Sequence, residues 1–194
     1  IYFIRPVHEQ LERKEKDLIN INCDFFTVWH YGKLKSEQEL KIKTEKYEKQ
    51  LLKAIESNPD KYDNFYYYHH LGNAYSQIGE KDKALASFIN SYTLYREGNY
   101  DFNSLAYGTI LVKIVSELLL NHSKYFEALP YLQELLTISP NFPDALFYLG
   151  FAFQGLEKFD LAIESYEKAI IILLENTYEN TLGIVSQEKS LLPM

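Results

Sequence analysis

The sequence predicts an all-α protein built from stacked helical hairpins. Residues 143–170 read as two amphipathic helices joined by a tight turn. In the second of these helices, Ala162, Tyr166 and Ala169 follow one another at steps of four and three, which places them on one face of a helix. The pattern recurs, because Ala128 stands thirty-four residues before Ala162. Tyr and Phe are abundant while Gly and Pro are few, which suits helices whose interfaces are filled by flat rings.

Small residues occupy the positions where the two helices of a hairpin are expected to cross. Gly150 precedes Ala162 in the stretch 143–170, and Gly72 precedes Ala84 in an earlier stretch. A residue without a large side chain lets two helix backbones approach and leaves room for an aromatic ring opposite. The sequence therefore predicts at least two hairpins of the same construction.

These residues resemble the tetratricopeptide repeat, a helix–turn–helix unit of about 34 residues. The resemblance rests on Leu-Gly and aromatic positions in the first helix and on small and aromatic positions in the second: Leu71, Gly72, Tyr75, Ala84, Phe88 and Ser91, then Leu149, Gly150, Phe153, Ala162, Tyr166 and Ala169. It implies a right-handed α-solenoid with units at 65–98, 109–142 and 143–176. The middle unit keeps Ala128 and Pro140 but departs from the pattern in its first helix.

The N-terminal part is less regular. Residues 1–40 are expected to form a partly helical extension, with a short extended piece at 1–4 and a weakly amphipathic helix at 8–19 that either docks on the array or stays exposed. Residues 41–64 read as a degenerate first repeat or a capping helix, which Asn58-Pro59 ends because Pro cannot continue a helix.

Turn residues mark the remaining boundaries. Gly79 is expected to close the first helix of unit 65–98, and Gly98-Asn99 to end its second. About ten additional residues follow, and Asp101 or Ser104 would cap the next helix.

The last helix becomes apolar nearly all round after Ala169. It must therefore be covered, either by residues 177–194, acting as a capping segment or tail, or by another protein. Self-association would use Ile170, Ile171 and Leu174.

Composition excludes several classes of function. A formal charge of −7 argues against nucleic-acid binding, which needs a basic face. The longest apolar run, 145–153, is far shorter than the roughly 20 residues of a membrane span. A single cysteine, Cys23, excludes an intramolecular disulfide framework and leaves the compartment open between the cytoplasm and a bacterial cell envelope or periplasm.

The sequence shows no catalytic or metal-binding pattern. Phosphate-binding Gly-rich loops, nucleophile elbows and paired zinc-ligand helices are missing from it. His69 and His70 are adjacent, so on a helix they diverge by about 100° and are poor joint ligands. We expect no enzyme activity, no cofactor and no metal.

The resemblance implies a concave groove lined by inward-pointing residues of the first helices. Carried over by position, these are Tyr66, His69, Asn73 and Ser76, then Ile110, Lys113, Glu117 and Leu120, then Asp144, Phe147, Phe151 and Gln154. Phe147 and Phe151 lie one helical turn apart and either anchor an apolar side chain of a partner or pack against the C-terminal tail. Some members of the family bind acidic chaperone C-termini through a clamp of Lys, Asn and Arg. Only Asn73 matches it, so that specificity is not expected.

The predicted function is a non-catalytic protein interaction module that binds a peptide or helix of a partner protein in the groove. Two alternatives remain open on the sequence. One is a structural or assembly subunit of a cell-envelope or secretion complex, and the other is a secretion chaperone of the same repeat type.

Overall fold

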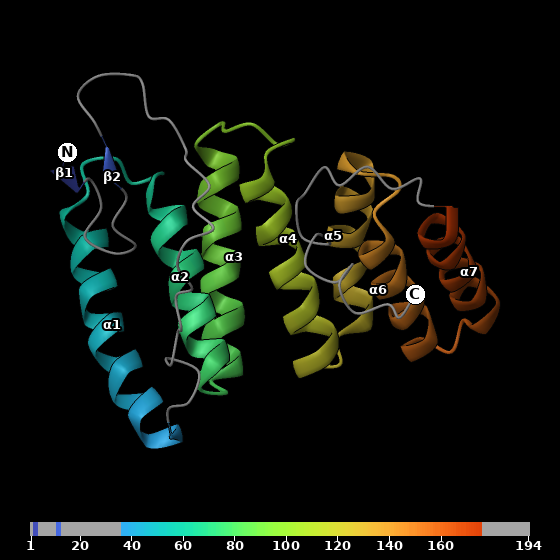
Figure 1. Cartoon of the computed structure of the whole chain (residues 1–194), viewed down its shortest axis with the longest axis horizontal. Helices are drawn as coiled ribbons and strands as arrows, with labels where there is room; N and C mark the ends of the chain where they lie inside the picture. Colours follow the sequence, from blue (N-terminus) through green and yellow to red (C-terminus); the bar gives the residue numbers. More distant parts are fainter. Residues whose placement is uncertain (1, 4–10, 13–35, 176–194) are drawn as a thin grey trace, which may run out of the picture.

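The computed structural model describes residues 2–3, 11–12 and 36–175. Within them, the helices succeed one another along the longest axis of the molecule, from α1 at one end to α7 at the other (Figure 1). Each helix packs chiefly on its neighbours in the sequence. The bounds are α1 Glu37–Ser57, α2 Asn64–Gln77, α3 Lys81–Glu97, α4 Leu105–Ser116, α5 Tyr125–Ile138, α6 Pro143–Gly155 and α7 Phe159–Glu175.

A small strand pair precedes the helices. Strand β1, Tyr2–Phe3, pairs antiparallel with β2, Leu11–Glu12. The helix expected over 8–19 is therefore wrong at Leu11–Glu12, where the backbone is extended. That segment has few apolar residues at helical spacing, and its backbone hydrogen-bonds to another strand instead. The other residues of the expected helix lie outside the described part of the chain.

Helix α1 begins and ends at residues whose chemistry sets those limits. At its start, the Ser36 hydroxyl accepts a hydrogen bond from the Glu39 backbone N–H, and the Glu39 carboxylate accepts one from the Ser36 backbone N–H. At its end, Asn58 has extended backbone angles and precedes Pro59. Leu51 is buried completely, and Tyr47 and Ile55 pack partly against the core from the same helix.

The hairpins α2–α3 and α6–α7 are built around the small residues that the sequence singled out. A Cβ atom at Gly72 would lie 2.5 Å from the Phe88 ring, and one at Gly150 would lie 2.6 Å from the Tyr166 ring. Ala84 of α3 is completely buried. Gly79 has a φ of 76°, in the left-handed region, and closes the turn after α2 as expected.

The residues between α3 and α4 are fastened to the array. The Tyr95 hydroxyl donates to the carbonyl oxygen of Asp101 at 2.8 Å, and the Tyr100 ring packs 5.0 Å from the Tyr95 ring. Ser104 is the N-cap of α4, because its hydroxyl accepts from the backbone N–H of Tyr107 at 3.2 Å. Of the two cap residues that the sequence offered, the structure uses Ser104.

The middle hairpin departs from plain α geometry. Helix α4 passes into a π-helix, η2 (Glu117–Asn121), before α5 begins at Tyr125. Ala128, Leu132 and Leu135 of α5 are all fully buried, so the second half of this unit packs as the register predicts. The core runs through the whole row of helices, and its largest fully buried side chains include Tyr107 of α4, Phe88 of α3 and Leu51 of α1.

Candidate partner-binding face

The first helices of the three hairpins are linked side by side. The Ser76 hydroxyl of α2 donates to the Glu117 carboxylate at the start of η2, and α4 and η2 both contact α6. We call the surface along these helices the first-helix face. Along these helices lie residues that the sequence assigned to the groove: Tyr66, His69, Asn73, Lys113, Glu117, Phe147 and Phe151. Not all of the assigned positions reach the surface, because Glu117 is 3% exposed and Ile110 is 1% exposed.

At the α2 end of the face, the two adjacent histidines have different surroundings. The His70 ring packs 4.4 Å from the Tyr66 ring, and the His69 ring lies 5.6 Å from the Phe88 ring in the hairpin interface. His69 Nδ1 is buried and has no hydrogen-bond partner among the described residues. Burial, and next the nearby Lys113 ammonium, lower the pKa of His69 to about 4. His69 is therefore a neutral, packed histidine at pH 7.

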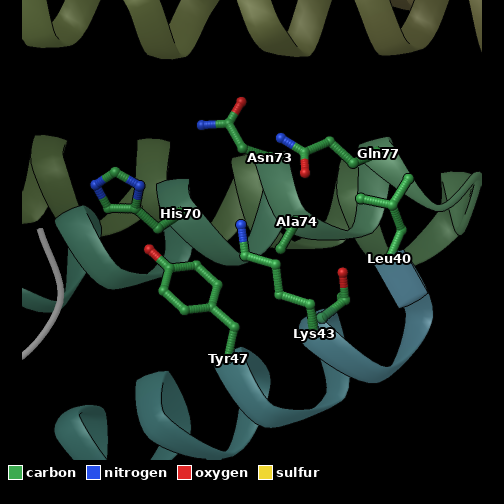
Figure 2. Close-up of a pocket in the computed structure, with 8 residues that line it drawn as sticks. Leu40, Lys43, Tyr47, His70, Asn73, Ala74 and Gln77 are labelled. Carbon is green, nitrogen blue, oxygen red and sulfur yellow. The ribbon is translucent and has the colours of Figure 1, made fainter. Parts of the chain in front are cut away.

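A recess of about 400 Å³ opens beside this end, between α1 and α2. Figure 2 shows Lys43 and Tyr47 of α1 facing the same space as His70, Asn73 and Gln77 of α2. The recess therefore combines amide, ammonium and ring groups over an apolar floor. Burial is the main cause that raises the pKa of Tyr47 to about 12.

Sequence reasoning found Asn73 but missed the contribution of α1 to this recess. Lys43 and Tyr47 stand at helical spacing in α1, four residues apart, which was the available signal. The resemblance assigned groove positions only to first helices, and α1 occupies the place of a second helix.

The middle of the face differs from expectation at Glu117. From the sequence we expected this carboxylate, four residues after Lys113, to line the groove and face a partner. In the structure, Glu117 is only 3% exposed. Its carboxylate accepts hydrogen bonds from Ser76 and from the Asn121 amide, the latter at 2.6 Å. Glu117 therefore holds α2 and η2 together and presents no charge to a partner, whereas Lys113 is half-buried and can still be reached.

At the α6 end, the two phenylalanines are not equivalent. Phe147 is 52% exposed, with its ring 5.5 Å from the Tyr166 ring. Phe151 is half-buried, packs against the core and lies 6.1 Å from the Tyr125 ring. Phe147 is therefore the more exposed of the two rings, and Phe151 packs largely into the core.

A second surface escaped the sequence analysis. A hollow of about 560 Å³ lies between α3 and α5, and its lining includes Ile89, Phe126 and Pro130. Phe126 is largely exposed there. The register assigned second helices to the outer side of the array and gave no reason to examine it. Phe126 is therefore an exposed ring outside the first-helix face.

Other kinds of site receive no support from the described residues. Among them, no three His, Cys, Asp or Glu side chains are grouped so that they could hold a metal ion. In the same part of the chain, no helix combines the length and the apolar character that a membrane span needs.

The helices thus define an all-α solenoid of hairpins, a class of protein whose repeated units form extended surfaces for binding. The family model described as Tetratricopeptide repeat matches residues 65–97 and 143–170, so the chain contains tetratricopeptide repeats in its α2–α3 and α6–α7 hairpins. The predicted repeat type and fold class are confirmed. The model does not match the middle hairpin, whose first helix departs from the repeat pattern.

Solved structures of MamA share this fold. MamA MSR-1 C2 is 18% identical, with a TM-score of 0.55, over 75% of this chain and 72% of that chain. MamA RS-1 ArsTM double mutant is 20% identical, with a TM-score of 0.53, over 76% and 81%. MamA AMB-1 P212121 is 20% identical, with a TM-score of 0.54, over 80% and 73%. No curated protein sequence matches the chain. Together, the repeats and the shared fold support a role in protein interaction or scaffolding.

Proposed function

We propose that this protein is a non-catalytic interaction module that holds a peptide or helix of a partner protein along the first-helix face, as the concave groove of the array. The observation that carries the proposal is the exposed Phe147 ring at one end of a row of reachable polar side chains on α2 and α4. An exposed ring supported by packed neighbours is the arrangement expected of a binding hot spot.

The two ends of the face favour different chemistry in the partner. At α6, Phe147 would contact an apolar side chain, and the packing of its ring against Tyr166 limits the entropy lost on binding. At α2, Asn73 and the neighbouring recess offer amide and ammonium donors, which suit backbone carbonyl or acidic groups. The proposed partner segment therefore has an apolar part that lies at α6 and a polar or acidic part that lies at α2.

The test uses a partner that co-purifies with the protein from its native source and is then titrated in purified form. We expect Phe147→Ala to weaken binding by about 10- to 100-fold, the effect of removing a hot-spot ring, with helicity by circular dichroism unchanged. Phe147→Ala combined with Phe151→Ala should weaken binding further, although Phe151 also supports the core.

The matched control is Phe126→Ala, because Phe126 is an exposed ring between α3 and α5 and lies outside the face. It should leave affinity unchanged. Full affinity in the Phe147 variants, or an equal loss of affinity in the Phe126 variant, would show that the partner does not bind through the first-helix face.

One specific observation favours a second candidate, a self-associating assembly subunit. Ile170, Ile171 and Leu174 form an exposed apolar surface on α7. Sedimentation at rising protein concentration would show oligomers that disappear in an Ile171→Lys, Leu174→Lys variant. A monomer at all concentrations would argue against this candidate. A secretion chaperone remains a third possibility, which co-purification of a partly unfolded client would favour.

A further inference from the structure

The α7 end of the array carries a groove between α6 and α7, with a volume of about 430 Å³. We call it the terminal groove. Its lining is mostly apolar and comes from both helices of the last hairpin: Pro143, Asp144, Phe147, Tyr166, Ala169, Ile170 and Leu173.

The position equivalent to Leu173 of the terminal groove is covered in both earlier hairpins. Counted from the start of each repeat, Leu173 corresponds to Tyr95 in the first unit and to Ser139 in the middle one. Tyr95 is 3% exposed and stacks on Tyr107 of α4, with ring centroids 5.2 Å apart, whereas Leu173 is 49% exposed. Ser139 is also buried. The helix that follows each earlier hairpin packs on it, because α4 contacts α3 and α6 contacts α5.

We infer that residues 176–194 of this chain cover the terminal groove. Residues 176–194 follow directly on α7, whose Leu173 lines the groove. Inside the array, connections at 98–104 and 139–142 lead to covering helices of 12 and 13 residues. Residues 176–194 contain as much chain as one such connection and its helix. They also carry apolar side chains suited to an apolar groove: Leu182, Ile184, Val185, Leu191 and Leu192.

The driving force is the removal of apolar surface from water. Phe147, Ile170 and Leu173 are each about half exposed, and Ala169 and Tyr166 lie between them in the groove. Covering these side chains removes their apolar surface from water and stabilises the folded protein, as the burial of Tyr95 already does in the first unit. The inference does not depend on the proposed function, although Phe147 contributes to both surfaces. A partner would then contact that ring beside the C-terminal residues.

Disulfide trapping in the full chain tests the inference. In a Cys23→Ser background, Phe147→Cys is combined in turn with Leu182→Cys, Ile184→Cys, Val185→Cys and Leu191→Cys. Mild oxidation should give an intramolecular disulfide in at least one pair, because docking raises the effective concentration of one thiol near the other. Non-reducing electrophoresis and peptide mass mapping identify the product.

The matched control places the first cysteine at Ile163, an equally exposed residue of α7 outside the groove. Intramolecular crosslinking from Phe147→Cys should be about tenfold faster than from Ile163→Cys. Equal rates would overturn the inference, and so would disulfides that form only between two molecules, since these would assign the groove to a second copy.

Thermal unfolding of the full chain gives an independent measurement. Ile170→Ser should lower the midpoint by about 3 to 6 °C if the groove is covered, because a covered isoleucine loses buried contacts. Ile163→Ser should change it by less than about 1 °C, as expected of an exposed site. Equal midpoints for the two variants would contradict the inference. Neither measurement involves the partner, so failure here leaves the proposed function standing.

Discussion

At the scale of single residues, the fold lowers the pKa of His69 well below the value of a free histidine. Its ring lies in the α2–α3 interface, and burial followed by the Lys113 charge lowers its pKa from 6.5 to about 4. Between these two pH values the unfolded chain binds more protons at this position than the folded protein does. The free energy of unfolding therefore falls as the pH is lowered from about 6.5 to about 4.

We predict that His69 accounts for a loss on the order of 2 to 3 kcal/mol across this pH window, and for none above it. Urea unfolding of the wild type and of His69→Asn at pH 7.5, 6, 5 and 4.5 would measure the difference. The variant should lose less stability between pH 6.5 and 4.5. An NMR titration that placed the His69 midpoint near 6.5 would contradict the prediction.

A second residue-scale prediction concerns Gly150. A Cβ atom there would lie 2.6 Å from the Tyr166 ring, a separation that requires the ring to move. The ring is also held by the hydrogen bond from the Tyr166 hydroxyl to the Gln154 side chain at 2.9 Å. We expect Gly150→Ala to lower the free energy of unfolding by about 1 to 3 kcal/mol, as overpacking does.

The control is the double variant Gly150→Ala, Tyr166→Ala, measured by urea unfolding. Removal of the ring should make the Gly150 substitution nearly neutral, because alanine is favoured over glycine in a helix. If the free-energy changes of the two single variants simply add in the double variant, the contact between the two residues does not limit the approach of α6 and α7.

At the scale of elements, one carboxylate connects three helices. Glu134 of α5 accepts hydrogen bonds from the Tyr107 hydroxyl of α4 at 2.5 Å and from the Tyr92 hydroxyl of α3 at 2.9 Å. Arg96 donates to the Tyr92 oxygen at 2.6 Å and pairs with Glu134 at 3.3 Å. Tyr107 is completely buried, so its hydroxyl has little access to water if Glu134 is removed.

We predict that Glu134→Leu lowers the free energy of unfolding by about 1 to 3 kcal/mol, the cost of leaving a buried donor unsatisfied. Glu134→Gln should cost less, because its amide oxygen can still accept from Tyr107. Chemical denaturation of both variants, alone and combined with Tyr107→Phe, would separate the contribution of the Tyr107–Glu134 hydrogen bond from that of the other Glu134 contacts. If Glu134→Leu costs as much in the Tyr107→Phe background as in the wild type, the bond to Tyr107 contributes nothing.

The elements also show which features a single sequence could predict. Ser104 was one of two caps that the sequence offered, because its position before an apolar run and its hydroxyl chemistry are local. The burial of Glu117 was not foreseen, because it depends on the contact with Ser76 of the neighbouring α2, which the periodicity of one helix does not reveal. Tyr107 could not be paired with Glu134 either, since their contact depends on how two helices cross.

At the scale of the whole molecule, the repeat register predicted the stack because each unit contacts mainly its neighbours. Small residues such as Gly72 and Gly150, at the same position within their units, were enough to establish the packing of helix pairs. The surfaces at the two ends of the array follow no such rule, because what covers them is not set by the repeat. The recess at α1 and the terminal groove at α7 therefore needed three-dimensional structure.

The same architecture leads to a prediction about how the molecule unfolds. In a row of helices, a substitution at one end weakens only the nearest units, whereas one in the middle weakens the coupling between both ends. Leu51 in α1 and Leu132 in α5 are both completely buried, so truncation of either to alanine should cost about 2 to 5 kcal/mol locally. The two changes differ mainly in their place along the array.

Hydrogen exchange followed by mass spectrometry would measure this difference. Leu51→Ala should increase exchange in α1 and α2 and leave α6 and α7 at wild-type protection. Leu132→Ala should increase exchange in α5 and in the helices on both sides of it, because α4 and α6 both pack on α5. A uniform loss of protection in both variants would mean that the described helices unfold as one cooperative unit, and the nearest-neighbour description would then be wrong for this protein.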